Sequence, residues 1–200
     1  MTAPKAMTTV EVLAFAWASS GGWRAMLRSF DFRLAVLVWA IASPFWLGPK
    51  WPDQVIAVLP NLLGFTLGGF AIFLGFGSDE FKGAIATPDE RTSPYLSVSA
   101  AFMLFVSFQV AALLSAIVAA AMFSWPTPEA LLPWLPWIQI GAKVGGGLGY
   151  FLFCFSVALI LRAAVRIFRL SRWYNIYLNS AARKRVQQGE PLNDSETRPH

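Results

Sequence analysis

The feature that most constrains this chain is a run of 37 residues, 92–128, without a single charged side chain. Residues 34–49 and 54–78 form two more uncharged blocks, and residues 137–161 form a fourth with one charge. A helix needs about 20 consecutive apolar residues to cross the hydrocarbon core of a bilayer. Two crossings within 92–128 would need about 40 residues and a turn, so we expect one helix there.

Composition leads to the same interpretation. Hydrophobic residues make up 56% of the 200 residues and charged residues only 14%, whereas soluble globular domains carry roughly 25% charged residues. The apolar residues occur in long blocks, without the alternation that marks a soluble core. The sequence therefore predicts a protein embedded in lipid.

We predict an all-α integral membrane protein with four transmembrane helices. The first block has only 16 uncharged residues and reaches spanning length if Arg33 snorkels toward the interface. Residues 1–30 are predicted to hold cytoplasmic and interfacial helices, residues 162–186 a cytoplasmic basic helix, and residues 187–200 a flexible tail. The four spans within the transmembrane domain, residues 31–161, are predicted at about 31–49, 54–77, 95–123 and 137–161.

Two signals organise the N-terminal region. Thr8 and Glu11 have the spacing of a capping box, and the helix that follows is expected to end at Gly21 and Gly22. An interfacial amphipathic helix is predicted next. Its apolar face would hold Trp23, Met26, Leu27 and Phe30, and its basic face Arg24 and Arg28.

The distribution of positive charge predicts the orientation. Lys and Arg in short loops remain on the cytoplasmic side of a membrane. Only Lys50 and Lys143 fall on the side predicted to be extracytoplasmic. Both termini are therefore predicted to be cytoplasmic, in a multi-pass protein of the bacterial inner membrane. The 14 cations assigned to the cytoplasm are Lys5, Arg24, Arg28, Arg33, Lys82, Arg91, Arg162, Arg166, Arg169, Arg172, Arg183, Lys184, Arg185 and Arg198.

Small residues recur at helical spacing in two spans. The second span holds Asn61, Gly64, Gly68, Ala71 and Gly75, and the fourth holds Gly141, Gly145 and Gly149 with Gly146 and Gly147 beside them. Small side chains let helix backbones approach closely in lipid. Two interpretations stay open. These seams either close the helix bundle inside one protomer, or join protomers around a symmetry axis as a glycine zipper that lines a pore.

Three polar residues are expected at membrane depth. Gln109 and Asn61 carry amides that must face protein or water, through an interhelical hydrogen bond or contact with a pore or ligand. Lys143 lies six residues after Trp137, about 9 Å along a helix, so its ammonium can snorkel to the outer interface. An intramembrane ionisable residue is also a functional candidate.

Four arginines follow the fourth span: Arg162, Arg166, Arg169 and Arg172. The first three share one helical face. We expect them to bind anionic lipid head groups or to dock a cytoplasmic protein partner. No nucleic-acid partner is expected, because a basic stripe beside a span already meets anionic lipid.

Catalytic residues, metal ligands and cofactors are not predicted. The only cysteine is Cys154 and the only histidine is His200, and the acidic pairs at 79–80 and 89–90 have no histidine near them. The protein is therefore not expected to be an enzyme, although a lipid-modifying activity is the third alternative.

The leading hypothesis is a homo-oligomeric inner-membrane protein that forms or gates a pore, as the membrane component of a small bacterial operon such as a defence or stress effector. The alternative is a membrane anchor or scaffold that recruits a cytoplasmic partner through its basic C-terminal helix.

Overall fold

The computed structural model describes residues 8–19, 21–75, 94–126 and 133–187. These residues form helices and no strand, which confirms the predicted all-helical class for the described part of the chain. The helices are α1 (Thr9–Ser19), α2 (Gly22–Arg28), α3 (Phe30–Ile41), α4 (Ser43–Trp46), α5 (Trp51–Gly75), α7 (Pro94–Ser124) and α8 (Leu135–Gln187).

Three of these helices are long and apolar enough to cross a membrane. They are Trp51–Gly75, Tyr95–Ser124 and the stretch Leu135–Ser180 of α8. Their length and composition are compatible with a multi-pass membrane protein, as the sequence predicts. The 79–91 loop and the tail after residue 187 lie outside the described residues.

The first predicted span, 31–49, does not form one long helix. It is divided into α3 with 12 residues and α4 with four, and the break falls at Ala42. Pro44 lies in the first turn of α4, and proline lacks the backbone N–H that a continuous helix would use. A helix of 12 residues is about 18 Å long, so α3 is too short to cross a bilayer alone.

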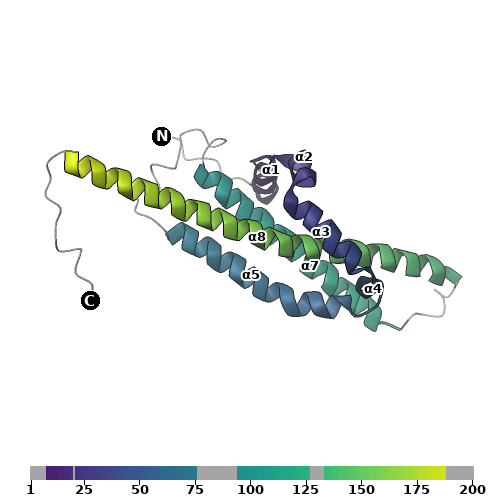
Figure 1. The fold of residues 1–200 in the computed structure, drawn as a ribbon. Coiled ribbons are helices and arrows are strands. Elements are labelled where there is room, and N and C mark those ends of the chain that lie inside the picture. Colours follow the sequence, from purple (N-terminus) through teal and green to yellow (C-terminus); the bar gives the residue numbers. More distant parts are fainter. Residues whose placement is uncertain (1–7, 20, 76–93, 127–132, 188–200) are drawn as a thin grey trace, which may run out of the picture.

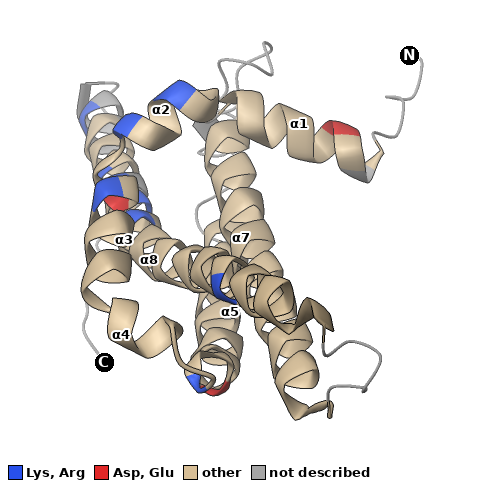
Figure 2. Ribbon diagram, turned by 90° about the vertical axis from the view of Figure 1, so that its right-hand side faces the viewer, with Lys and Arg blue, Asp and Glu red and all other residues tan. Residues whose placement is uncertain are grey.

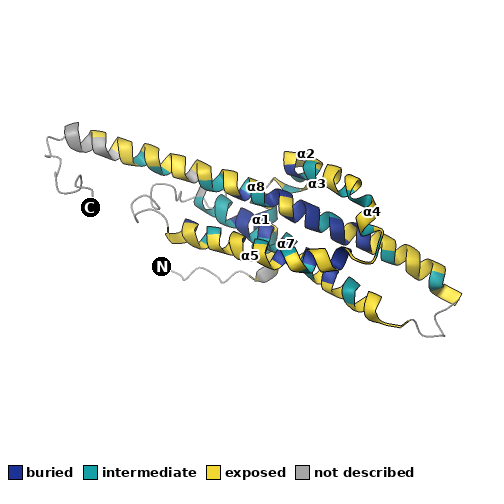
Figure 3. Ribbon diagram, turned by 60° about the horizontal axis from the view of Figure 1, so that its bottom comes forward, coloured by how far each residue is buried: buried dark blue, intermediate teal, exposed yellow. Residues whose placement is uncertain are grey.

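The bundle is built around α5, α7 and α8, which lie side by side over much of their length (Figure 1). Helix α3 packs on α8, and α1 packs on α7. Most of the buried residues lie where α5, α7 and α8 meet (Figure 3). The core combines large residues of α5, such as Trp51 and Leu59, with small residues of α7, such as Ala112 and Ala116. The pairing of large with small side chains lets these helices pack closely.

One continuous helix of 53 residues, α8, holds both the predicted fourth span and the predicted basic helix. At 1.5 Å per residue it is about 80 Å long, and its C-terminal part extends beyond the rest of the bundle (Figure 1). Before this part, α8 still contacts α5, because Tyr174 and Tyr177 pack against Phe73. The predicted fourth span and the predicted basic helix are therefore joined without a break in α8.

The predicted capping box is present at the start of α1. The backbone N–H of Thr8 donates to Oε2 of Glu11 at 2.7 Å, and the N–H of Glu11 donates to Oγ1 of Thr8 at 3.4 Å. The bond from the Thr8 backbone stabilises the carboxylate and lowers the pKa of Glu11. Gly21, with a φ of 85°, and Gly22, with a φ of 64°, then redirect the chain into α2.

The predicted interfacial helix is shorter than the sequence suggests. Ser29 has an extended backbone, and its Oγ accepts a hydrogen bond from the Phe32 N–H at 3.1 Å. This cap starts a new helix, so Phe30 belongs to α3 and not to the helix that contains Trp23. The local preference of serine for the N-cap position divides the predicted apolar face.

Candidate functional site

The small-residue positions of α5 lie on the outer surface of the chain. We call Asn61, Gly64, Gly68, Ala71 and Gly75 the α5 seam; all five are exposed. A Cβ atom added to any of its three glycines would meet no atom of another described element within 4 Å. The opposite face holds Val55, Leu59, Thr66 and Phe73, which are buried. Within the described residues, the seam therefore does not close the bundle of one protomer.

The tandem glycine run of α8 is divided between two environments. Gly141 and Gly145 are exposed, with no contact around an added Cβ, whereas Gly149 is buried. A Cβ at Gly149 would lie 2.7 Å from the Trp51 ring and 2.9 Å from Oγ of Ser115. Only the last glycine of the run is a close contact between helices of the protomer.

The neighbouring glycines make the other close contacts. A Cβ at Gly146 would lie 3.1 Å from Nε1 of Trp51, and one at Gly147 would lie 3.0 Å from the Trp46 ring. Sequence reasoning placed these two beside the GxxxG run and gave them no partner. In the sequence, Trp46 and Trp51 on either side of the short loop between α4 and α5 are what could have indicated this role. Their large rings pack closely only against a helix surface that lacks side chains.

Tryptophan side chains also attach α3 and α4 to α8. Nε1 of Trp39 donates to the backbone oxygen of Gly147 at 2.7 Å. Nε1 of Trp46 donates to the backbone oxygen of Trp39 at 2.9 Å, and the two rings stack with centroids 5.0 Å apart. Both tryptophans are half-buried, and indole N–H groups in an apolar environment need such partners. The short helices are thus fixed by specific contacts.

Gln109 lies inside the bundle with an exposed fraction of 1%. Its Nε2 donates to Oγ1 of Thr66 at 2.9 Å, and Thr66 donates in turn to the backbone oxygen of Leu62 at 2.9 Å. Oε1 of Gln109 has no hydrogen-bond partner among the described residues. Gln109 therefore joins α7 to α5 through one end of its amide.

Asn61 and Lys143 occupy different surroundings from Gln109. Both are exposed, and Nδ2 of Asn61 donates to the backbone oxygen of Ala57 in its own helix at 3.3 Å. Lys143 lines a cavity with Gly48 and Trp51, near the loop that leads into α5. It therefore lies at the end of the bundle where α5 begins, close to the segment that carries Lys50.

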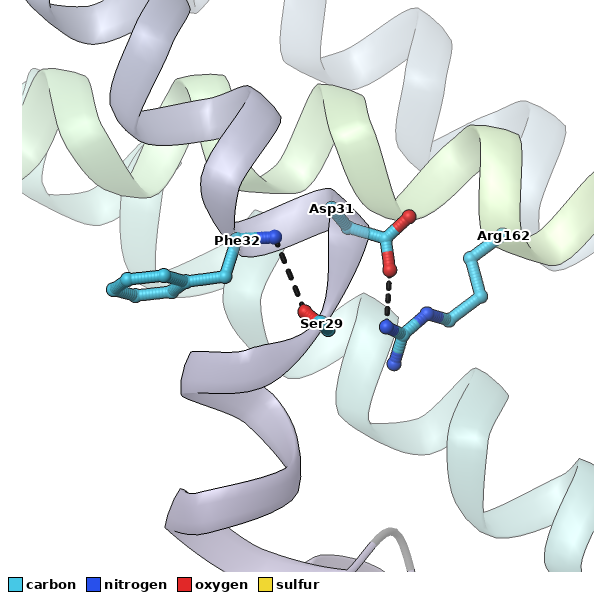
Figure 4. A network of polar contacts seen from close by, with 4 residues as sticks. All are labelled: Ser29, Asp31, Phe32 and Arg162. Atoms are coloured by element: carbon cyan, nitrogen blue, oxygen red, sulfur yellow. Dashed lines mark hydrogen bonds and ion pairs between the residues drawn. The ribbon is translucent and has the colours of Figure 1, made fainter.

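An ion pair joins the start of α3 to the middle of α8. The carboxylate of Asp31 contacts the guanidinium of Arg162, and Asp31 is buried (Figure 4). Four residues further along α8, Nη1 of Arg166 donates to the backbone oxygen of Ser97 in α7 at 3.3 Å. Two arginines of one helix face thus hold α3 and α7 against α8.

Other basic residues lie toward the same end of the molecule as this ion pair (Figure 2). Arg169 and Arg172 are exposed on α8, and the basic residues of α2 lie at the same end of the molecule (Figure 2). Sequence reasoning identified the arginines and missed Asp31. The sequence feature that could have indicated Asp31 is that it is the single acidic residue among the cations just before the first apolar block.

The described residues include no group of three or more His, Cys, Asp or Glu side chains that could hold a metal ion. The acidic pairs at 79–80 and 89–90 lie outside the described residues.

Comparison of the chain with protein-family models, with curated proteins and with solved structures gives no match. What the protein does therefore has to follow from its own residues and their arrangement.

Proposed function

We propose that the protein is a homo-oligomeric membrane protein whose protomers meet along the α5 seam and surround a pore that they form or gate. The observation that supports this proposal is the division of α5 into two faces. Its large side chains pack inside the bundle, whereas its small residues are exposed and lack contacts in the described chain. The hydrophobic effect does not drive helices together in lipid, but close packing of small-residue faces does.

The character of the pore follows from the side chains along the seam. Apart from Asn61, the seam offers water little except backbone, and Phe65 and Ile72 are exposed beside it. A narrow apolar axis excludes water and is closed by dewetting. Opening then requires a conformational change, and the N-terminal helices and the long α8 are the elements positioned to transmit one.

We also infer a fourth crossing and cytoplasmic termini, in a protein of the bacterial inner membrane. Side chains of α3 contact α8 from Arg162, which pairs with Asp31, to Gly147, whose backbone oxygen accepts from Trp39; the Trp46 ring of α4 also lies against Gly147. These contacts span 15 residues of α8, or about 22 Å, so the crossing would need a locally thinned bilayer. Arginines at one end and Lys50 and Lys143 at the other support this orientation.

Substitutions on the seam test the proposal. Gly68→Leu should dissociate the oligomer and leave the protomer folded, because the added side chain meets no other part of the described chain. Ala111→Leu is the matched control, since Ala111 is exposed on α7, outside the seam. Ala71→Asn should raise basal ion leak by wetting the axis. Oligomer mass in detergent and ion flux in liposomes are the measurements.

Two results would contradict the pore. If Gly68→Leu and Ala111→Leu both retained the wild-type oligomer mass, the seam would not be a contact between protomers. If the oligomer formed along the seam but neither the wild type nor Ala71→Asn conducted ions, the assembly would not be a pore.

The second candidate function is a scaffold that recruits a cytoplasmic protein. The observation that favours it is the C-terminal part of α8, which extends beyond the bundle (Figure 1). From Arg172 to Arg183, α8 passes the end of α5, where Tyr174 and Tyr177 pack against Phe73, and exposes both arginines together with Trp173 and Ile176. Basic and apolar side chains on one projecting helix form a surface for an acidic, amphipathic partner. If the oligomer conducted no ions, the scaffold would be the better supported of the two functions.

A further inference from the structure

The start of α3 and the middle of α8 border an open cavity of about 440 Å³. We call it the arginine pocket. Its basic lining comes from Arg162, Arg166 and Arg169, at spacings of four and three residues along one face of α8. Residues at these spacings lie above one another on a helix. The side chains of all three arginines therefore border one pocket.

Asp31 compensates only part of this charge. It pairs with Arg162, so the pocket of three arginines and one carboxylate keeps a formal charge of +2 (3 − 1 = 2). Arg166 uses one of its N–H groups on Ser97, and a guanidinium has five. Arg169 is exposed. The pocket therefore offers several charge-assisted donors to an anion, and guanidinium groups match the geometry of phosphate oxygens.

The remaining lining is apolar. Phe30, Leu161 and Val165 border the pocket, with exposed fractions of 62%, 52% and 42%. On the N-terminal side of Arg162, α8 carries no charge from Val144 to Leu161. The pocket thus lies where an apolar helix surface changes into a basic one. A small soluble anion would contact only the arginines, whereas a molecule with an anionic head and an apolar tail would contact both surfaces.

We propose that the arginine pocket binds the phosphate group of an anionic membrane lipid, with the lipid tail along Leu161 and Val165. This site is independent of the proposed pore, because it uses α3 and α8 and none of the α5 seam. Asp31 positions Arg162 and sets the net charge of the pocket. Bound phosphate would add to the contacts that hold α3 against α8.

The test compares two arginines that differ in position but not in charge. Arg169 lines the pocket, whereas Arg172, three residues further along α8, is exposed and does not line it. Purified protein is titrated with phosphatidylglycerol, and with phosphatidylcholine as the zwitterionic reference, and bound lipid is counted by native mass spectrometry. Arg169→Gln should weaken phosphatidylglycerol binding about fivefold or more, whereas Arg172→Gln should leave it unchanged.

Asp31→Asn gives the opposite expectation. It removes the compensating carboxylate while Arg162 remains, so phosphatidylglycerol should bind about fivefold more tightly. Thermal unfolding of each variant in detergent shows whether it is folded. If Asp31→Asn fails to fold, the comparison of Arg169→Gln with Arg172→Gln still decides the proposal.

Three results would overturn it. Equal weakening by Arg169→Gln and Arg172→Gln would indicate general attraction to a basic surface. Unchanged binding in Arg169→Gln would exclude the pocket. Displacement of the lipid by an equal concentration of soluble glycerol phosphate would identify a soluble phosphate compound as the ligand. The mass of the oligomer, measured in the same spectra, reports on the α5 seam separately.

Discussion

Gln109 and Thr66 form a buried polar pair between α7 and α5, with Nε2 and Oγ1 2.9 Å apart. An amide in hydrocarbon must find a partner, and the hydroxyl of Thr66 satisfies the donor end. The acceptor end of Gln109 lacks a partner in the described chain. The pair therefore fixes the register of α5 against α7, while its net contribution to stability remains small.

Replacing Thr66 should show how much the hydrogen bond to Gln109 contributes to stability. Thr66→Val keeps the shape of the side chain but removes the acceptor, so the donor end of the Gln109 amide loses its partner and neither end is then paired in the described chain. We expect a loss of about 1 kcal/mol in the free energy of unfolding, the usual size of such a bond in a membrane protein. Unfolding of the purified protein in mixed micelles with increasing denaturing detergent measures it.

The double variant Thr66→Val with Gln109→Leu is the control. Removal of both partners leaves no unpaired polar group, so the double variant should be at least as stable as Thr66→Val alone. A double variant that lost the sum of the two single effects would show that the two side chains do not interact.

Among the helices, α8 illustrates how one element can carry two kinds of glycine. Gly149 faces Trp51 and Ser115 at distances that leave no room for a side chain, whereas Gly145, one turn earlier, faces open space. Both belong to the same GxxxG run. Their difference arises because Trp51, at the start of α5, packs against only part of this helix face.

The two glycines are therefore expected to respond differently to the same change. Gly149→Leu should separate α5, α7 and α8 and lower the stability of the protomer by about 3 kcal/mol, the upper part of the range for overpacking a core. Gly145→Leu should leave the protomer as stable as the wild type. Denaturation in detergent, at concentrations where the oligomer is dissociated, distinguishes them. Equal destabilisation by both substitutions would contradict this packing of α8.

The whole molecule has a basic end and a less charged end. Asp31, Arg162 and Arg166 bring α3, α7 and α8 together at the basic end, while Lys143 lies near the start of α5 at the other. Retention of Lys and Arg in the cytoplasm would place the basic end inside the cell. Asp31 at the start of α3 contacts Arg162, whereas Trp39 near the end of α3 contacts Gly147, so α3 extends along α8 from the basic end toward the other end.

Labelling of single cysteines tests this orientation. In a background with Cys154→Ala, Lys50→Cys should react with a membrane-impermeant maleimide on intact spheroplasts. Arg183→Cys should react only after the membrane is permeabilised, because its part of α8 would be cytoplasmic. Labelling of Arg183→Cys on intact spheroplasts would reverse the proposed topology.

The sequence by itself determined the helices and much of their extent. Uncharged blocks of spanning length have to form helices in lipid, because a helix satisfies every backbone hydrogen bond within the segment. Local chemistry also determined the ends, as the Thr8 and Glu11 capping box demonstrates. The positions of the candidate arginines and glycines were therefore recognisable without a structure.

Only the tertiary structure decided which face of each helix is inside. In a membrane protein the lipid-facing side is as apolar as the core, so hydrophobic periodicity cannot distinguish them. The exposure of the α5 seam, the burial of Gly149 and the pairing of Asp31 with Arg162 all depend on contacts between residues distant in sequence. The break at Ala42 is different, because it follows from the local chemistry of Pro44. The tryptophan contacts that hold the two short helices in place, however, require α8 beside them.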